Sequence, residues 1–221
     1  MDELAFVSVA FGPAYLEQMD RLEKSIKDFY PNANIIFFRG PSLESKEGFP
    51  HGAKTFRESM YGFKPHAIQE AIDKGFDKVV WVDPAMILVD KVDDMFKHPM
   101  IAIKDVTPLH NVTSKKAAQY FQTTHYDIEM KQWHLVGGSF YYFNFKDFRV
   151  RSIFDLWRQS EIDGIFGSQY EAAFGGIEGH RNDETCMALS MYSYRIFPIT
   201  HDEGRYNNPD TNPMWIKKHF K

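Results

Sequence analysis

The sequence predicts an α/β fold built on a mostly parallel sheet. Buried, β-rich segments alternate with segments whose apolar residues recur at helical spacing. The strand segments are residues 4–10, 34–38 and 78–82, and the helical segments are 15–29 and 64–74. This order is typical of parallel strands joined by crossover helices. Ligands of such sheets bind beyond the carboxyl ends of the strands, so we expect function after Ala10 and after Val82.

The second half of the chain is less regular. A mixed, polar segment over residues 105–132 is expected to form a helix-containing insert above the sheet. Apolar and aromatic runs predict further strands, and helical spacing predicts further helices. The expected strands are residues 101–104, 135–145 and 195–199, and the expected helices are 148–160 and 183–192.

Composition excludes several classes of function. The chain has 221 residues, 43% of them hydrophobic, which is enough for a sizeable core. Its formal net charge of −4 gives no electrostatic footprint for nucleic acid. Its apolar runs are too short to span a membrane. The single cysteine, Cys186, is expected to be a small buried hydrophobe. No basic leader segment is visible, so we expect a cytoplasmic protein.

The strongest motif covers residues 78–96, KVVWVDPAMILVDKVDDMF. Asp83 ends a buried strand, and an aspartate at that point projects into the ligand crevice. There it can hold a divalent cation against a diphosphate. A turn-capping role for Asp83 is the alternative.

This segment resembles the glycogenin and galactosyltransferase-like glycosyltransferases, which have the GT-A fold. Their pattern is a strand, a DxD motif, an apolar stretch and an Asp-Asp-Leu-Phe-like helix start. Asp83 matches the first Asp of DxD, and residues 93–96 match the helix start. Ala85 stands where the second Asp is expected, so the DxD motif is degenerate and metal dependence is left open.

Residues 8–15, SVAFGPAY, resemble the first strand and nucleotide loop of the same family. The resemblance implies that Ala10, Phe11 and Gly12 contact the nucleotide and that Tyr15 packs on a uracil ring. Gly12 would let the backbone approach the ligand closely. The alternative for Tyr15 is a core position at the start of a helix.

Residues 61–66, YGFKPH, resemble the segment in which a Lys or Arg faces the nucleotide phosphates. Lys64 at a helix N-terminus is unfavourable for the helix dipole, which favours an anionic partner. A solvated lysine is the alternative, and Arg57 is a second candidate for the same role.

Gly137, Gly138 and Ser139 lie where the family places a strand beside the donor sugar. Adjacent glycines in an otherwise bulky strand indicate close approach by a ligand or by backbone. The resemblance implies sugar binding, and a β-bulge is the alternative.

The remaining site residues follow from two later segments. Residues 180–184, HRNDE, resemble the family's Asp-Gln step near the reacting centre, which implies catalytic roles for Asp183 and Glu184. Asp183 can equally be a helix N-cap. His201 resembles the late histidine that completes the metal site with Asp83, and His219 is its rival.

Together these matches predict one GT-A-like domain over 1–221, with a nucleotide-binding half (about 1–100) and a sugar- or acceptor-binding half (about 101–221). The resemblance implies transfer from a UDP-sugar, with Mn²⁺ or Mg²⁺ recruited alongside the diphosphate, to a glycan, protein or small-molecule acceptor. The chain is also consistent with one module of a larger transferase. The alternatives are a degenerate nucleotide-sugar-binding domain and a sugar-phosphate nucleotidyltransferase.

Overall fold

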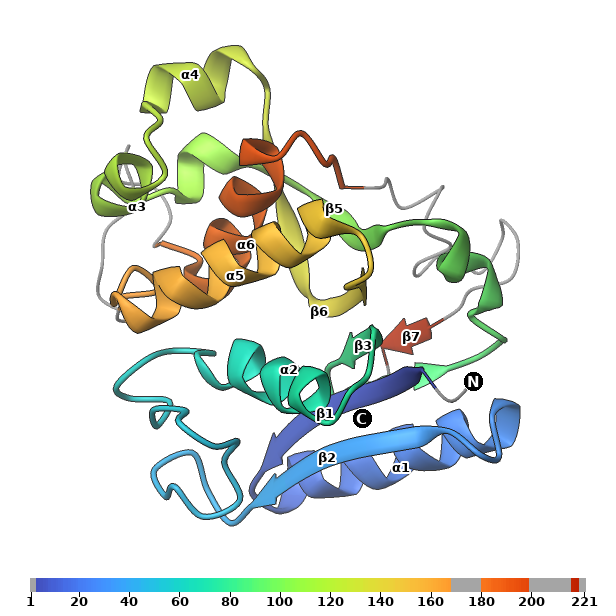
Figure 1. Cartoon of the computed structure of the whole chain (residues 1–221). Coiled ribbons are helices and arrows are strands. Elements are labelled where there is room, and N and C mark those ends of the chain that lie inside the picture. The colour runs from blue at the N-terminus through green and yellow to red at the C-terminus, as the bar shows by residue number, and fades with distance from the viewer. Residues whose placement is uncertain (1–2, 168–179, 199–215, 219–221) are drawn as a thin grey trace.

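The computed structural model describes residues 3–167, 180–198 and 216–218. Its first half is the expected alternation of strands and helices (Figure 1). Strand β1 pairs in parallel with β2 on one side and β3 on the other. The elements are β1 (Leu4–Phe11), α1 (Pro13–Phe29), β2 (Asn34–Gly40), α2 (Phe63–Asp73) and β3 (Lys78–Val82). The sequence therefore predicted this half correctly.

The larger sheet has the strand order β2-β1-β3-β6-β5 among the described residues. Strand β6 (His134–Asn144) runs antiparallel to β3, and β5 (Met100–Pro108) runs antiparallel to β6. Strand β5 consequently points the same way as the first three strands. The expected direction holds for all of these strands except β6, and the sheet is mixed.

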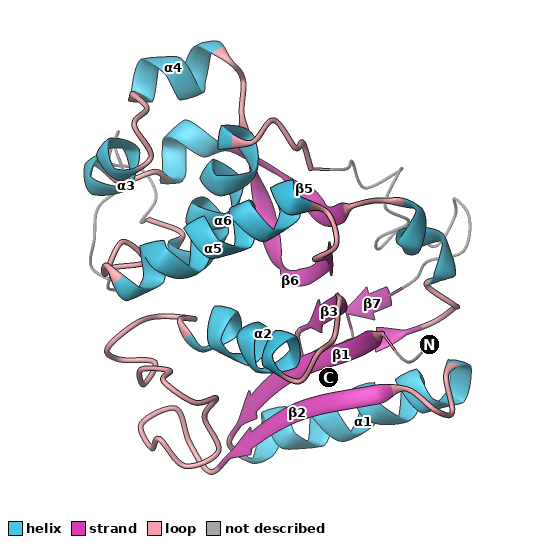
Figure 2. Ribbon diagram, viewed as in Figure 1, coloured by secondary structure: helices cyan, strands magenta, loops and turns pink. Residues whose placement is uncertain are grey.

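Helices cover both faces of the sheet (Figure 2). Side chains alternate along a strand, so Val79 and Trp81 face one core while Val80 and Val82 face the other. The first core packs against α2, α5 (Phe148–Ile162) and α6 (Asn182–Ser193). The second core packs against α1 through Leu22 and other apolar residues.

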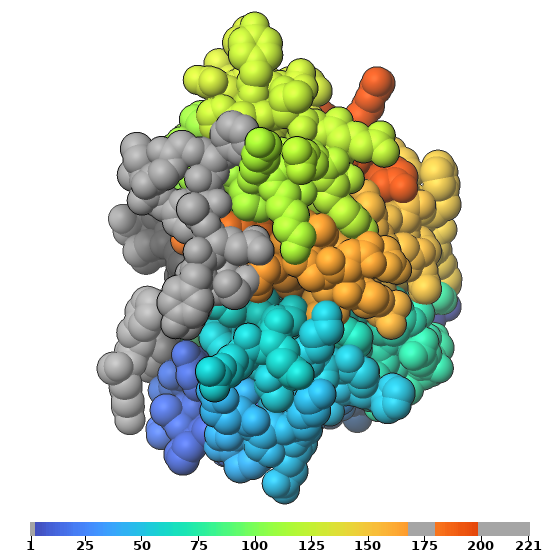
Figure 3. Space-filling model, turned by 90° about the vertical axis from the view of Figure 1, so that its left-hand side faces the viewer, coloured from blue at the N-terminus to red at the C-terminus, as the bar shows by residue number. Residues whose placement is uncertain are grey.

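Residues 105–132 form the expected insert. After β5 the chain makes a short 3₁₀ helix, η2 (Leu109–Val112), and the helices α3 (Lys115–Tyr120) and α4 (His125–Met130). In Figure 3 the first half of the chain occupies the lower part of the molecule, and the described residues of the second half occupy the upper part. Another 3₁₀ helix, η1 (Asp93–Lys97), follows the short strand β4 (Met86–Leu88), which pairs with β7 (Ile216–Lys218). No helix in the described ranges is long and apolar enough to cross a membrane.

One predicted strand is wrong. Residues 195–198 lie outside any strand, and the remaining residue of that prediction, 199, lies outside the described residues. The backbone of Arg195 adopts a positive φ of 56°, and the amide of Ile196 donates to the carbonyl of Met191. This turn closes α6 and redirects the chain. Cys186 is buried within α6, as predicted.

Helices α2 to α6 all end in the same type of turn. In each, a residue with positive φ and the residue after it donate amide hydrogen bonds to the last helical turn. Glycine occupies that position after α2 and α5, as Gly75 (φ 90°) and Gly164 (φ 73°). After α3, α4 and α6 it is Gln122, Gln132 and Arg195, with φ of 51°, 51° and 56°. A side chain at such a position costs about 1 kcal/mol or more.

We therefore expect Gln132→Gly to raise the free energy of unfolding by about 1 kcal/mol, measured by urea denaturation. The matched control is Gly75→Gln, which should lower it, because a Cβ at Gly75 meets no atom within 4 Å and only the backbone conformation is penalised. A Gln132→Gly protein less stable than the wild type would contradict this account of the helix ends.

Candidate active site

A pocket of about 420 Å³ opens at the carboxyl ends of β1 and β3. Of the residues predicted to bind nucleotide, Phe11, Tyr15, Lys64 and Asp83 line it, and Ala85 does so as well. Three further aromatic side chains line it, namely Phe56, Tyr61 and Phe63. The pocket therefore combines flat apolar surfaces with one cation and one carboxylate.

The other predicted nucleotide contacts lie differently. Tyr15 is 50% exposed, which excludes the core position considered for it. Gly12 has a positive φ of 79°, and its amide donates to the carbonyl of Gly40. Ala10 is buried in β1 beside Phe11. Arg57 is exposed and is not among the residues that line the pocket.

Lys64 is the centre of the site. It lies in the first turn of α2, and its side chain is 4% exposed, which excludes a solvated lysine. Its Nζ donates to Asp183 Oδ2 at 2.7 Å and to the carbonyl of Gly138 at 3.0 Å. The ammonium also lies 4.8 Å from the centroid of the Tyr61 ring. Lys64 thus joins the pocket to residues of the second half of the chain.

Carboxylates set the charge state of this cluster. Burial alone would lower the pKa of Lys64, but the charges of Asp183, Asp83 and Glu184 raise it above its ordinary value. Burial raises the pKa of Asp183 above its ordinary value, against the opposing charge of Lys64. The ammonium therefore remains charged at neutral pH.

Gly138 allows these side chains to meet. A Cβ at this position would lie 2.8 Å from Lys64 Nζ and 3.0 Å from Glu184 Cγ and Oε1. Its amide donates to Glu184 Oε1 at 2.9 Å. The register between β5 and β6 also shifts in this region. The groups close to Gly138 are thus side chains of this chain, not the ligand or backbone that the glycine pair predicted. At Gly137 a Cβ would meet only a carbonyl oxygen at 3.9 Å.

Asp183 is not a helix cap. The N-cap of α6 is Arg181, whose side chain makes no capping hydrogen bond, and the Asp183 carboxylate instead contacts Lys64. The Trp157 indole donates to the Asp183 carbonyl at 2.9 Å, which fixes the backbone there. Arg181 pairs with Glu184 at 2.6 Å. The two predicted catalytic carboxylates therefore face the same cluster.

The predicted metal ligands are only partly within the described residues. Asp83 lines the pocket, and its Oδ1 accepts a hydrogen bond from the Trp81 indole at 3.1 Å. The amide of Asp83 donates to the carbonyl of Ser139. His201 lies outside the described residues. Across the described ranges, no group of three potential metal-binding side chains occurs.

The comparisons place this architecture among known folds. No family model and no curated protein matches the sequence. The structure matches that of the bifunctional glycosyltransferase WbbM in its apo form, with a TM-score of 0.54 and 12% identity. The match covers the whole chain but only 46% of WbbM. An active-site mutant of LgtC matches with a TM-score of 0.50 and 11% identity, over 98% of this chain and 87% of LgtC.

The chain has a GT-A glycosyltransferase fold. A complex of the galactosyltransferase LgtC with donor and acceptor sugar analogues is also similar, at a TM-score of 0.48 and 12% identity, over 98% of this chain and 87% of LgtC. The matches to WbbM and to the LgtC mutant confirm the fold resemblance stated from the sequence.

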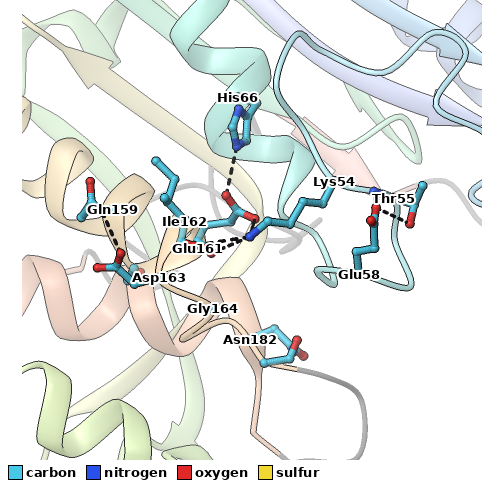
Figure 4. Close-up of polar contacts among 12 residues, drawn as sticks. Lys54, Thr55, Glu58, His66, Gln159, Glu161, Ile162, Asp163, Gly164 and Asn182 are labelled. Carbon is cyan, nitrogen blue, oxygen red and sulfur yellow. Dashed lines mark hydrogen bonds and ion pairs between the residues drawn. The ribbon is translucent and has the colours of Figure 1, made fainter.

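A second buried cluster supports the pocket wall of this GT-A fold (Figure 4). Glu161, at the end of α5, is fully buried and accepts from His66 Nε2 at 3.0 Å, while Lys54 Nζ lies 3.3 Å from its other oxygen. Burial alone would raise the pKa of Glu161, but the hydrogen bond from His66 and the charge of Lys54 hold it below the ordinary value. The cluster ties α5 to the segment that carries Phe56 and Tyr61.

Sequence reasoning missed Tyr61, Trp81 and Glu161. Tyr61 has a positive φ of 59°, and the following Gly62 leaves room for Glu161, since a Cβ there would lie 2.9 Å from Glu161 Oε1. The Tyr-Gly pair was the available signal for this tight turn. Nothing near Glu161 in the sequence indicates burial, because its partners lie more than 90 residues away.

We expect Glu161→Gln to lower the free energy of unfolding by about 1–3 kcal/mol at neutral pH, because it keeps the size but removes the charge that faces His66 and Lys54. Urea denaturation measures the change, and exposed Glu44→Gln is the control. Since the folded pKa of Glu161 is lowered, this contribution is present above the ordinary glutamate pKa and disappears as the pH falls through the folded value. Equal stability of Glu161→Gln and the wild type at neutral pH would contradict the role of the cluster.

Proposed function

We propose that this protein is a glycosyltransferase that moves a sugar from a nucleoside-diphosphate donor, a UDP-sugar, to an acceptor hydroxyl. One observation carries the proposal: the pocket at the carboxyl ends of β1 and β3 combines Tyr15 and other aromatic rings with Lys64 and Asp83. An aromatic wall fits a nucleobase, and a fixed cation fits a diphosphate. Sheets of this kind bind ligands at this edge.

Lys64 is the residue placed to stabilise the leaving nucleotide. Its ammonium is charged, buried and held by Asp183 and the Gly138 carbonyl, so it needs no rearrangement during the reaction. A preorganised charge of this kind stabilises negative charge that develops in the transition state. Asp183 pairs with Lys64, and Glu184 accepts from the amide of Gly138, a glycine that the sequence resemblance places beside the donor sugar.

The first test is release of UDP from UDP-sugars, with and without candidate acceptors. We expect slow donor hydrolysis without acceptor and faster UDP release with one. Ala85 favours a second candidate, a domain that binds nucleotide sugars without turnover. UDP binding without any donor hydrolysis would select that candidate, and absence of both would overturn the proposal.

Tyr15→Ala tests the base site. A half-exposed ring that lines the pocket is available to stack on a base, and its removal should weaken UDP binding by about 1–3 kcal/mol. Calorimetry measures the affinity, and Tyr126→Ala is a matched exposed control on α4. Unchanged UDP affinity in folded Tyr15→Ala would rule out stacking by this ring.

We propose that the donor recruits the divalent cation. Around Lys64 and Arg181 lie Asp83, Asp183 and Glu184, so acidic groups already outnumber cations before a diphosphate enters. Asp83 supplies one carboxylate, with His201 as its proposed partner, and diphosphate oxygens can supply further ligands. A bound Mn²⁺ or Mg²⁺ would neutralise charge on the diphosphate.

Calorimetric titration of Mn²⁺ should therefore show weak binding to the free protein and stronger binding to the UDP complex. By linkage, Mn²⁺ must raise the affinity for UDP by the same factor. Asp83→Asn should reduce this coupling. Tight Mn²⁺ binding without nucleotide would reveal ligands beyond Asp83 and His201, and UDP affinity indifferent to Mn²⁺ and to EDTA would show that the site works without a metal.

A further inference from the structure

A larger hollow, of about 870 Å³, lies away from the donor pocket. The ends of α3, α4 and α6 surround it, and we call it the helix-end groove. An α-helix rises about 1.5 Å per residue, so the end of α6 at Ser193 lies about 15 Å from Asp183 at its start. Six residues that line the helix-end groove have polar, charged or aromatic side chains that a ligand could contact: Tyr120, Gln122, Lys131, Trp133, Tyr194 and Arg195.

The helices that end around this groove, α3, α4 and α6, have a residue other than glycine at the positive-φ position after the helix. Gln122 and Arg195 line it, and Gln132 lies between its lining residues Lys131 and Trp133. Helices α2 and α5 have Gly75 and Gly164 in the same conformation, and neither glycine lines the groove. The end of α5 still lies next to it, because the Tyr120 hydroxyl donates to Asp163 Oδ2 at 2.8 Å. Positive φ at non-glycine residues is often found at ligand-binding sites. At each position the strained backbone presents a long hydrogen-bonding side chain.

The lining has the chemistry of a carbohydrate site. The exposed Tyr194 ring can pack on the apolar face of a sugar, while amide, hydroxyl and cationic side chains can bind its hydroxyl groups. The Trp133 ring is stacked on Tyr192 at 4.5 Å, and Lys131 Nζ lies 4.7 Å from its centroid. The charged residues that line the groove are Lys131 and Arg195, both cations, although the whole chain carries a net charge of −4. Neither forms an ion pair with another described residue. Such a surface favours an anionic ligand.

We propose that the helix-end groove binds an acidic oligosaccharide. Resting on the proposed function, this names the acceptor class: a glycan chain with carboxylate groups, held in the groove by one part while its growing end reaches the donor site. The separation of the groove from Asp183 requires a chain, since a single sugar cannot occupy both places.

The test is direct binding in the absence of nucleotide, so it does not depend on transfer activity. Hexasaccharides of hyaluronan and of polygalacturonate are titrated against maltohexaose, a neutral control, and the fluorescence of Trp133 and the other tryptophans is followed. We expect an acidic hexasaccharide to bind at least tenfold more tightly than maltohexaose.

The decisive variant is Gln122→Gly with Arg195→Gly. Glycine is favoured at both positions, so the double variant should fold at least as well as the wild type while losing two ligand-facing side chains. We expect it to lose at least tenfold in acidic-glycan affinity and to keep wild-type UDP affinity. Tyr15→Ala, in the donor pocket and at a half-exposed residue, should leave glycan binding unchanged.

Three results would overturn the proposal. The first is that neither acidic hexasaccharide binds more tightly than maltohexaose, and the second is that the double glycine variant binds the acidic hexasaccharides as tightly as the wild type. The third is a dimer in sedimentation that the double glycine variant abolishes, which would make the groove an interface between copies. Failure of UDP binding with intact glycan binding would instead refute only the proposed donor, because the two ligands are measured separately.

Discussion

A buried ion pair between Lys64 and Asp183 connects the two halves of this molecule. The lysine belongs to α2, which packs beside the parallel strands, and the aspartate opens α6, which packs against β6. Both side chains are almost fully buried, at 4% and 2% exposure. Removing one partner of such a pair leaves an uncompensated charge and costs about 3–5 kcal/mol. The relative position of α2 and α6 is therefore strongly constrained.

Several neighbouring groups provide the hydrogen bonds and the space that this buried ion pair requires. The Gly138 carbonyl accepts from both Lys64 Nζ and the Trp81 indole, and only glycine leaves space for this approach. The Trp157 indole donates to the Asp183 carbonyl at 2.9 Å. Two large buried indoles thus serve as hydrogen-bond donors within the core, as buried tryptophans commonly do. The hydrogen-bonded Lys64 and Asp183 side chains therefore form a fixed charged pair next to the aromatic pocket.

Local sequence patterns predicted most helices and strands of the fold. They could not predict contacts between residues that lie far apart in the sequence. Helical spacing and buried runs placed the strands and helices of the first half correctly, because strands buried on both faces read as continuous apolar runs and the helices repeat apolar residues at helical spacing. The reversed direction of β6 has no local signature, since an apolar strand reads alike in either direction. The run at 195–199 reads as a strand because a few apolar residues do not reveal the turn found at its start.

The site shows the same division. Lys64, Gly138 and Asp183 were singled out individually from helix position, glycine pairing and motif order. Their mutual contact was not predicted, because the sequence gives no sign that residues 119 positions apart form an ion pair. The burial of Glu161 was missed for the same reason. Chemistry could be assigned to residue types, and only the fold brought them together.

We propose that the Lys64–Asp183 pair forms the reacting centre of a glycosyltransferase. The most direct measurement compares UDP affinity and donor turnover in Asp183→Asn, with Asp155→Asn as an exposed control on α5 and circular dichroism to verify folding. The account predicts that turnover falls by about 10²-fold or more while UDP affinity persists, as for an interaction made mainly in the transition state. Wild-type turnover in a folded Asp183→Asn protein would contradict it.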